Sequence, residues 1–206
     1  MSVNITWLGH AGVMIRYISS VVYIDPWKVD PALPKADIIL LTHDHYDHYS
    51  ENDVRMLSND STRVVAPMAS SLVTDRMKPG DVLKIGDVTV STIPAYNINK
   101  DFHPRKNNWV GYVVGIGGKV LYHAGDTDRI DEMKGVKADM VFLPVGGTYT
   151  MTASEAVMAI DDIKPAHAVP IHFGDIVGTK DDAKRLMESR ICKVHILDKG
   201  DTISLD

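Results

Sequence analysis

The chain has 206 residues, of which 45% are hydrophobic and 24% charged, the balance of an ordinary globular protein. Its formal net charge of -5 disfavours a dedicated nucleic-acid binder, which usually carries a basic stripe. The single cysteine, Cys192, excludes both an intramolecular disulfide and a thiolate zinc cluster. The sequence shows no secretory leader and no apolar run of the ~18 residues that a membrane helix needs, so we expect a cytoplasmic protein without a membrane partner.

Short apolar runs rich in β-branched residues predict strands in the first third of the chain. We expect these strands at 3–8, 12–17, 21–24, 38–41 and 63–66. Ser50, with Asp53 three residues later, predicts a helix N-cap and a helix over 51–57. A second short helix is expected over 69–77, ended by Pro79 and Gly80.

The second half alternates strands and helices. Strands are expected at 88–93, 110–116, 119–123, 140–145 and 168–171, with an irregular polar stretch over 97–108. Gly117 and Gly118 predict a hairpin turn. Thr152 and Glu155 form a capping box for a helix that ends before Pro165. Further on we expect a helix over 181–190 and a last hairpin over 193–205.

Each half supplies strands first and strand–helix units later, and no linker or low-complexity segment separates the halves. This pattern predicts the α/β class, as a four-layer αβ/βα sandwich of two mixed β-sheets with outer helices. We expect a single domain over residues 1–206. Two domains of roughly 100 residues each are the alternative.

The clearest chemical signal is the cluster His43-x-His45-x-Asp47-His48, which follows the buried strand 38–41. Side chains two residues apart in an extended segment point the same way, so His43 and His45 could share one metal ion. The chain then turns toward a helix, which swings Asp47 and His48 to the neighbouring side. Imidazole and carboxylate donors favour Zn(II), with Mn(II) and Fe(II) as alternatives. The competing interpretation is a polar helix entry with surface histidines.

This cluster resembles the His-x-His-x-Asp-His signature of the metallo-β-lactamase superfamily. The likeness covers nearly the whole chain, because the segments 7–10, 23–26, 123–127 and 170–174 also match in the expected order. Within the superfamily, the chain is most similar to small stand-alone metal-dependent hydrolases related to the lactonase that opens ascorbate 6-phosphate. The resemblance implies the αβ/βα sandwich and a metal-dependent hydrolase.

The resemblance also implies a set of metal ligands: His43 and His45 for a first metal, Asp47, His48 and His172 for a second, and Asp126 as a bridge. Asp47 and Asp126 would in addition act catalytically, by accepting a proton during turnover. Asp126 follows the strand 119–123 and His172 follows the strand 168–171, and loops at strand ends commonly carry functional side chains. A helix-capping Asp126 and a solvated His172 are the alternatives.

One position departs from the superfamily pattern. The third ligand of the first metal usually lies in a turn after the strand held here by 88–93, where this chain has Pro94-Ala95-Tyr96-Asn97 and no histidine. His103 is the nearest replacement, as a ligand or a substrate contact, and a solvated loop histidine is the competing interpretation. A coordinating Tyr96 phenolate is a rarer alternative.

Four further residues are candidates for substrate contact or for support of the ligands: His10, Asp25, Tyr96 and His123. Asp25 could orient a ligand histidine through its free ring nitrogen, unless it is an ordinary turn aspartate. For His123 a core or supporting role is favoured over ligation, and for His10 a role at the site stands beside a plain turn histidine. His167 and His195 fit no cluster and are expected to be structural or exposed.

The expected function is the hydrolysis of an ester, lactone or phosphoester bond of a small molecule by a metal-activated water. We expect one or two divalent ions, with zinc favoured and manganese or iron as alternatives. A phosphodiesterase or nuclease on the same scaffold is the alternative enzyme, disfavoured by the lack of a basic tract. A non-catalytic metal-binding sensor is the alternative outside the enzymes, favoured only by the missing histidine. The sequence leaves a homo-oligomer open.

Overall fold

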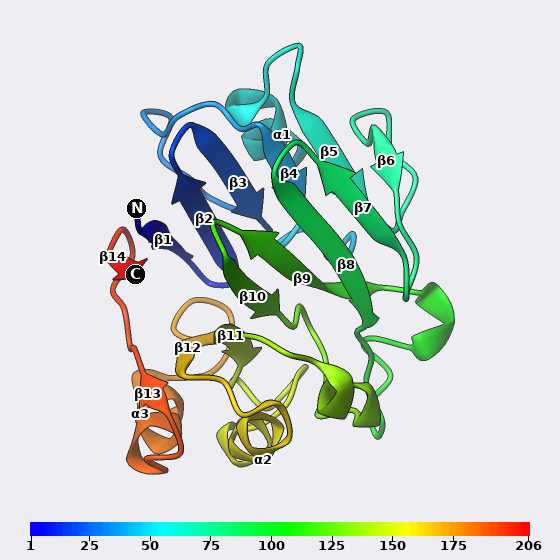
Figure 1. Cartoon of the computed structure of the whole chain (residues 1–206). Helices are drawn as coiled ribbons and strands as arrows, with labels where there is room; N and C mark the ends of the chain where they lie inside the picture. The colour runs from blue at the N-terminus through cyan, green and yellow to red at the C-terminus, as the bar shows by residue number, and fades with distance from the viewer. The chain divides into compact units, whose positions relative to one another are not determined.

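The computed structural model describes residues 1–206, which divide into two compact units (Figure 1). The first unit comprises Met1–Met77 and Leu197–Asp206, and the second comprises Lys78–Ile196. Each unit is built on one seven-stranded mixed sheet. The prediction of two mixed β-sheets is therefore confirmed, and the single domain over 1–206 stays a prediction.

The sheet of the first unit runs in the order β14-β1-β2-β3-β4-β5-β6. Its strands are β1 (Val3–Gly9), β2 (Gly12–Tyr17), β3 (Ser20–Ile24), β4 (Ile38–Leu40), β5 (Arg63–Ala66), β6 (Asp75–Arg76) and β14 (Thr202–Leu205). From β14 to β3 neighbouring strands are antiparallel, and from β3 to β6 they are parallel. The parallel β4 and β5 are connected through α1 (Glu51–Leu57), whose buried Val54 and Leu57 belong to a core cluster with Ile39.

The second unit repeats this division of strands. Its sheet runs in the order β13-β12-β11-β10-β9-β8-β7. The strands are β7 (Val82–Ile85), β8 (Val88–Pro94), β9 (Val110–Ile116), β10 (Lys119–His123), β11 (Met140–Pro144), β12 (His167–Ile171) and β13 (Lys193–Val194). Neighbours are antiparallel from β7 to β10 and parallel from β10 to β13.

Helices cover the parallel half of the second sheet. Helix α2 (Ala153–Ile163) packs against β11, and α3 (Lys180–Glu188) packs against β12, β13 and α2 (Figure 1). Thr152 and Glu155 close the predicted capping box of α2, and Ser50 caps α1 by accepting from the Asp53 nitrogen. Two short 3-10 helices, η1 (Arg105–Asn107) and η2 (Asp131–Gly135), complete the unit.

The parallel strands determine where the candidate residues meet. In the first unit Ile24 lies opposite Leu40, so the chain leaves β3 and β4 at the same edge of the sheet. In the second unit His123 lies opposite Phe142, and Pro144 lies opposite Ile171. Loops at the carboxyl edge of parallel strands are the usual place of ligand sites in α/β proteins.

The helix expected over 69–77 is wrong. Residues Asp75–Arg76 form β6 instead, beside β5. The Thr74 nitrogen donates to the Val64 carbonyl, and the Met77 nitrogen donates to the Ala66 carbonyl. These backbone N–H groups are therefore hydrogen-bonded to the neighbouring strand and not to carbonyls within a helix. Val73 and Thr74 are β-branched and favour this extended course. The sequence reasoning also missed β7.

The last hairpin expected over 193–205 is also wrong. Strand β13 pairs in parallel with β12 of the second unit, whereas β14 pairs antiparallel with β1 of the first. The predicted turn does exist, because the Asp201 nitrogen donates to the Asp198 carbonyl and Gly200 has a φ of 95°. A tight turn thus joins strands that belong to different sheets.

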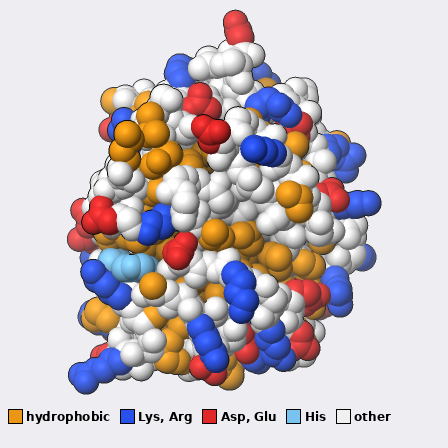
Figure 2. Space-filling model, in the orientation of Figure 1, with side chains coloured by type: hydrophobic (Ala, Val, Ile, Leu, Met, Phe, Trp, Pro, Cys, Tyr) orange, Lys and Arg blue, Asp and Glu red, His pale blue; other side chains and the backbone are white.

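Basic and acidic side chains are interspersed over the face shown in Figure 2. No helix of the structure has the length and apolar character needed to cross a membrane.

Candidate metal centre

In the first unit, Asp25 and Thr42 organise the histidines of the motif. Asp25 follows β3, is fully buried, and accepts hydrogen bonds from the Thr42 nitrogen at 2.8 Å and the Thr42 hydroxyl at 2.6 Å. Its Oδ2 also accepts from His48 Nδ1 at 2.7 Å. His48 therefore carries its proton on Nδ1 and offers Nε2 as a donor to a metal. Asp25 thus contacts a predicted ligand histidine, and its supporting role at a metal site stays a prediction.

The next histidine is oriented by Thr42. The Thr42 hydroxyl gives its hydrogen to Asp25, so it accepts from His43 Nδ1, which lies 2.9 Å away. This contact places the proton of His43 on Nδ1 and its lone pair on Nε2, the atom that would bind a metal. The Nε2 atom of His43 lies 3.1 Å from Nδ1 of His45, so the two rings direct nitrogen atoms toward one place.

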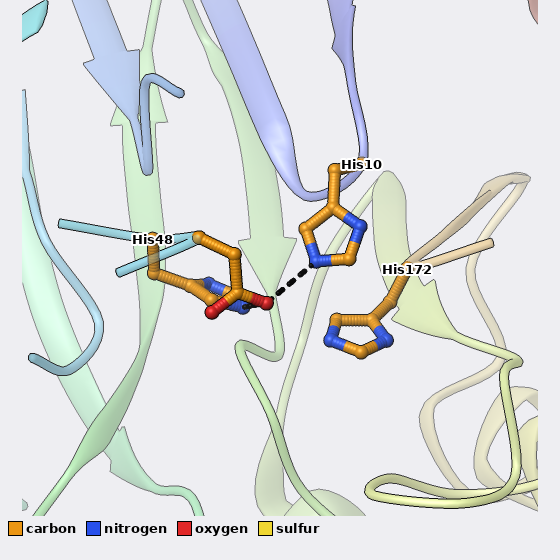
Figure 3. Close-up of side chains that lie close together, drawn as sticks. His10, His48 and His172 are labelled. Carbon is orange, nitrogen blue, oxygen red and sulfur yellow. Dashed lines mark hydrogen bonds and ion pairs between the residues drawn. The ribbon is translucent and has the colours of Figure 1, made fainter. Parts of the chain in front are cut away.

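Asp47 and His48 belong to a second group of donors in the same unit, and His10 joins them. His10 Nε2 donates to Asp47 Oδ2 at 3.0 Å, drawn as a dashed line in Figure 3. His48 Nε2 lies 3.8 Å from the same oxygen. The ligand atoms of the three residues all lie within 4.8 Å of one another. The structure therefore places His10 among the donors of this unit.

In the second unit three candidates meet around one carboxylate. Asp126 Oδ2 lies 3.2 Å from His103 Nε2 and 3.1 Å from His172 Nε2. All three residues are buried, and His172, which is labelled in Figure 3, directly follows β12. His103 is therefore no solvated loop residue, and it lies beside the predicted Asp126 and His172.

The position of His103 depends on residues that sequence reasoning did not identify. His103 Nδ1 lies 3.2 Å from both Asn97 Oδ1 and the Tyr149 carbonyl oxygen, so it donates to these acceptors and leaves Nε2 facing Asp126. The Asn97 amide in turn donates to Asp128 Oδ1 at 3.0 Å and to the Tyr149 carbonyl oxygen at 2.9 Å. The only available signal was the position of Asn97 within the polar stretch 97–108 and of Asp128 two residues after Asp126.

Three of the candidate residues have a positive φ, a backbone conformation that non-glycine residues rarely adopt. His10, Asp25 and His172 have φ values of 49°, 45° and 58°. A non-glycine residue in this region costs of order 1 kcal/mol, and such residues occur often at functional sites. In all three cases the residue directly follows a strand.

A close backbone approach supports His172. A Cβ atom added to Gly146 would lie 2.7 Å from the His172 carbonyl oxygen and 3.4 Å from its Nδ1 atom. Gly178 approaches Gly146 in the same way, with an added Cβ only 2.9 Å from the Gly146 Cα. Glycine at these two positions lets the loops after β11 and β12 pack directly on each other.

Tyr96 and His123 lie near these donors but have other partners. The Tyr96 hydroxyl donates to Glu132 Oε2 at 3.1 Å, and burial together with this carboxylate raises the Tyr96 pKa. A coordinating Tyr96 phenolate is therefore disfavoured. His123 ends β10, is fully buried, stacks on Phe142 and accepts from the Gly125 nitrogen. A core or supporting role for His123 stays a prediction.

His167 and His195 lie apart from the donors described above. His167 begins β12 and its Nδ1 lies 2.9 Å from His195 Nε2, with the two rings stacked. Desolvation, followed by the positive charge of Lys193, lowers the pKa of His167; desolvation, followed by His167, lowers the pKa of His195. The pair connects β12 to the segment after β13.

Buried imidazole and carboxylate donors at the carboxyl edge of a mixed sheet in each unit are the ligand types of metal-dependent hydrolases. Residues 4–172 match the family model of the β-lactamase superfamily domain. The chain belongs to this superfamily and, within it, to the UPF0173 metal-dependent hydrolases. It is accordingly a metal-dependent enzyme of the hydrolase class.

Relatives of similar length carry this assignment. The UPF0173 metal-dependent hydrolase of Caldivirga maquilingensis is 30% identical, over 97% of this chain and 96% of that one. A UPF0173 protein of Pyrococcus abyssi is 32% identical, over 91% of each chain. A crystal structure of a metal-dependent hydrolase from Parabacteroides distasonis superposes with a TM-score of 0.84 and 32% identity, covering 94% of this chain and 92% of that one. The fold-class prediction is confirmed; the closer likeness to the ascorbate 6-phosphate lactonase stays a prediction.

Proposed function

We propose that the chain hydrolyses an ester, lactone or phosphoester bond of a small molecule with one or two divalent metal ions. The observation that carries the proposal is the same arrangement in each unit. Asp47 Oδ2 faces His10 and His48 in the first unit, and Asp126 Oδ2 faces His103 and His172 in the second. A carboxylate between two imidazoles is a ligand set for a catalytic divalent metal.

The donor chemistry fits such an ion. A nitrogen of His43 lies 3.1 Å from a nitrogen of His45, and Asp25 and Thr42 orient His48 and His43 so that each ring carries its lone pair on Nε2. Zinc is the favoured metal for nitrogen and carboxylate donors, with manganese and iron as alternatives. When bound, the metal polarises the scissile carbonyl or phosphoryl oxygen and lowers the pKa of a water molecule toward ~7.

The chain supplies the proton transfers of this reaction. Water adds across the scissile bond, so that the acyl or phosphoryl group gains a hydroxyl and the leaving oxygen gains a proton. Asp47 and Asp126 are the carboxylates proposed to take up the proton from water and return it to the leaving oxygen. His10 and His103 hold the Oδ2 atoms of these carboxylates at 3.0 Å and 3.2 Å.

The first test measures metal and turnover together. Purified protein should contain one to two transition-metal ions per chain, lose them to a chelator, and hydrolyse members of a panel of esters, lactones and phosphodiesters. Protein that takes up metal but hydrolyses no member would support the non-catalytic sensor. Cleavage restricted to phosphodiesters would support the phosphodiesterase.

The second test is Asp126→Ala, with Asp60→Ala as the control because Asp60 is exposed and lies in a turn of the first unit. Asp126→Ala should lose activity on the order of 10²-fold or more, because the carboxylate between two imidazoles is removed. Asp60→Ala should keep the unmutated rate. Equal rates for the two variants on a confirmed substrate would contradict the role of Asp126.

A further inference from the structure

Two tryptophan side chains of the first unit contact His10, the residue that donates to Asp47. The Trp7 indole Nε1 donates to the His10 carbonyl oxygen at 3.2 Å. The Trp27 ring packs edge-on against the His10 ring, with 5.3 Å between centroids. His10 is buried and has a φ of 49°, and such a conformation persists only where surrounding contacts hold it. One tryptophan thus contacts the backbone of His10 and the other contacts its ring.

Trp27 lies in the segment that follows β3, and Asp53 holds the backbone of this segment. Asp53 Oδ2 accepts from the Lys28 nitrogen at 3.0 Å, and Asp53 Oδ1 lies 3.3 Å from the Val29 nitrogen. Asp53 is buried in the first turn of α1, and hydrogen bonds to an ionised carboxylate are stronger than those between neutral groups. The two residues directly after Trp27 are therefore fixed to α1.

Lys199 connects the segment that carries Trp27 to the turn that carries His10. Its Nζ donates to the Lys28 carbonyl oxygen at 2.7 Å. The stem of the same side chain packs on Gly9, where an added Cβ atom would lie 3.2 Å from Lys199 Cδ. Gly9 directly precedes His10, so one side chain contacts both segments. The Lys28 ammonium group, 3.8 Å from the centre of the Trp27 ring, contacts that ring as well.

We propose that Trp27 is a positioning residue for the hydrolysis: its ring fixes the His10 ring so that Nε2 donates to Asp47 Oδ2. Asp53 contributes by holding the segment that carries Trp27. The proposal rests on the proposed function, in which Asp47 exchanges a proton with water. Such a carboxylate needs a fixed position, because a displacement of about 1 Å can reduce a rate roughly 100-fold. Trp27 acts through His10 and takes no part in the reaction itself.

The first test follows two ring protons by nuclear magnetic resonance, in the whole chain after chelation. The His10 Nε2 proton is bonded to Asp47, and the His48 Nδ1 proton is bonded to Asp25. His10→Gln and His48→Gln assign the two signals. In Trp27→Ala the His10 proton should exchange with solvent roughly tenfold faster or more, while the His48 proton keeps its rate. Trp27→Phe retains an aromatic edge and should restore most of the protection.

The contribution of Asp53 has a matched control on the same helix. Asp53→Asn retains one acceptor oxygen, so it should accelerate exchange of the His10 proton less than Trp27→Ala does. Glu51→Gln removes a charge from the same first turn of α1, where Glu51 is exposed, and should leave both ring protons unchanged. Equal exchange in the two variants would show that Asp53 does not act on His10.

The second test is kinetic and uses a confirmed substrate at saturating zinc, with metal content measured for every variant. Trp27→Ala should lower kcat roughly 10–100-fold with little change in KM, and Trp27→Phe should recover most of the loss. An unchanged kcat, an unchanged exchange rate of the His10 proton, or equal acceleration of both ring protons would each overturn the positioning role. An unmutated protein that hydrolyses no substrate, with the exchange results as expected, would instead remove the hydrolase function.

Discussion

The Asp25 carboxylate connects three parts of the first unit. It follows β3 and accepts from the backbone and hydroxyl of Thr42, which follows β4, and from the ring of His48. Its φ of 45° aims the side chain toward these donors. Because Asp25 Oδ2 accepts from His48 Nδ1, the carboxylate fixes both the ring plane and the tautomer of His48.

Asp25→Asn tests this role at the scale of one residue. The amide keeps the size of the side chain but removes the charge and one acceptor oxygen, so the His48 ring loses its fixed tautomer. We expect metal affinity to fall roughly 10–100-fold, measured by competition with a chromogenic chelator. Asp44→Asn is the control, because Asp44 belongs to the same motif but is exposed. An affinity equal to that of the control would show that Asp25 supports only the fold.

At the scale of elements, the stretch from Asn97 to Pro104 is a loop that hydrogen bonds and an ion pair hold in place. Asp128 accepts from the Asn97 amide and from the Ile98 nitrogen, and it pairs with Lys100. Asn97 then accepts from the His103 nitrogen and contacts its ring. The loop carries His103. The Asp128 carboxylate therefore determines both the conformation of the loop and the position of the His103 ring.

Asp128→Asn should loosen this loop while leaving the sheet intact. Hydrogen bonds to a charged group contribute about 1.5–3 kcal/mol, so amide hydrogen exchange in the loop should accelerate roughly tenfold or more. Exchange in β9 and β10 should not change. Asp101→Asn lies exposed on the same loop and serves as the control. Unchanged exchange near His103 would mean that Tyr149 and the backbone alone hold the loop.

The contact between β12 and the segment after β13 predicts a dependence of stability on pH. The pKa values of His167 and His195 are lowered by desolvation and by neighbouring charge, chiefly Lys193 for His167 and His167 for His195, and the Asp139 carboxylate opposes part of the shift at His167. The folded chain therefore prefers the neutral rings. The unfolded chain binds protons first as pH falls, so this contribution to stability is complete above pH ~6.5 and is lost below it, through the lower folded pKa values.

His195→Gln removes one of these titrating groups. The free energy of unfolding from urea titrations at pH 7.5 and 5.5 should fall less in this variant than in the unmutated protein. Lys106→Gln, an exposed substitution on η1, is the control and should keep the unmutated difference. Equal pH dependence in all three proteins would mean that the histidine pair does not contribute.

Most helices and strands could be predicted from the sequence because turns and helix caps depend on residues close together in the chain. The hairpin at Gly117 and the caps at Ser50 and Thr152 depend on residues within a few positions of each other. The segment 69–77 has only the β-branched Val73 and Thr74 as a local signal, and its strand is determined by pairing with β5. The end of the chain is similar, since the partner of β14 is β1, about two hundred positions away in the sequence.

The candidate metal-site residues also divide into those with a local sequence signal and those that depend on long-range contacts. His43, Asp47 and His48 were found because they are adjacent in one motif, and Asp25 because it follows a strand and precedes a proline. Asn97 and Tyr149 act on His103 through an amide and a backbone carbonyl, and neither group has a compositional signature. Their roles become visible only when the fold brings distant loops together.

At the scale of the whole molecule, the two units use their sheets in the same way. Each sheet has an antiparallel half and a parallel half, and each places imidazole and carboxylate side chains after its parallel strands. These donors bring polar groups into buried surroundings, with His48 and Asp25 fully buried. A bound cation compensates the cost of burying such groups, so the metal should contribute to folding as well as to catalysis.

Removal of the metal should therefore lower the unfolding temperature of the whole chain. A ligand that binds only the folded state stabilises by about 2.7 kcal/mol at a free concentration of 100 times its Kd. For a chain of this size each kcal/mol shifts the Tm by about 2–4 °C, so chelation should lower the Tm by about 5–11 °C. Differential scanning calorimetry with a chelator, and again after zinc is restored, measures this difference. Asp126→Ala should respond more weakly because it lacks the carboxylate that faces both His103 and His172. An unmutated protein whose Tm does not change between the chelated and zinc-restored states would contradict metal binding by these donors.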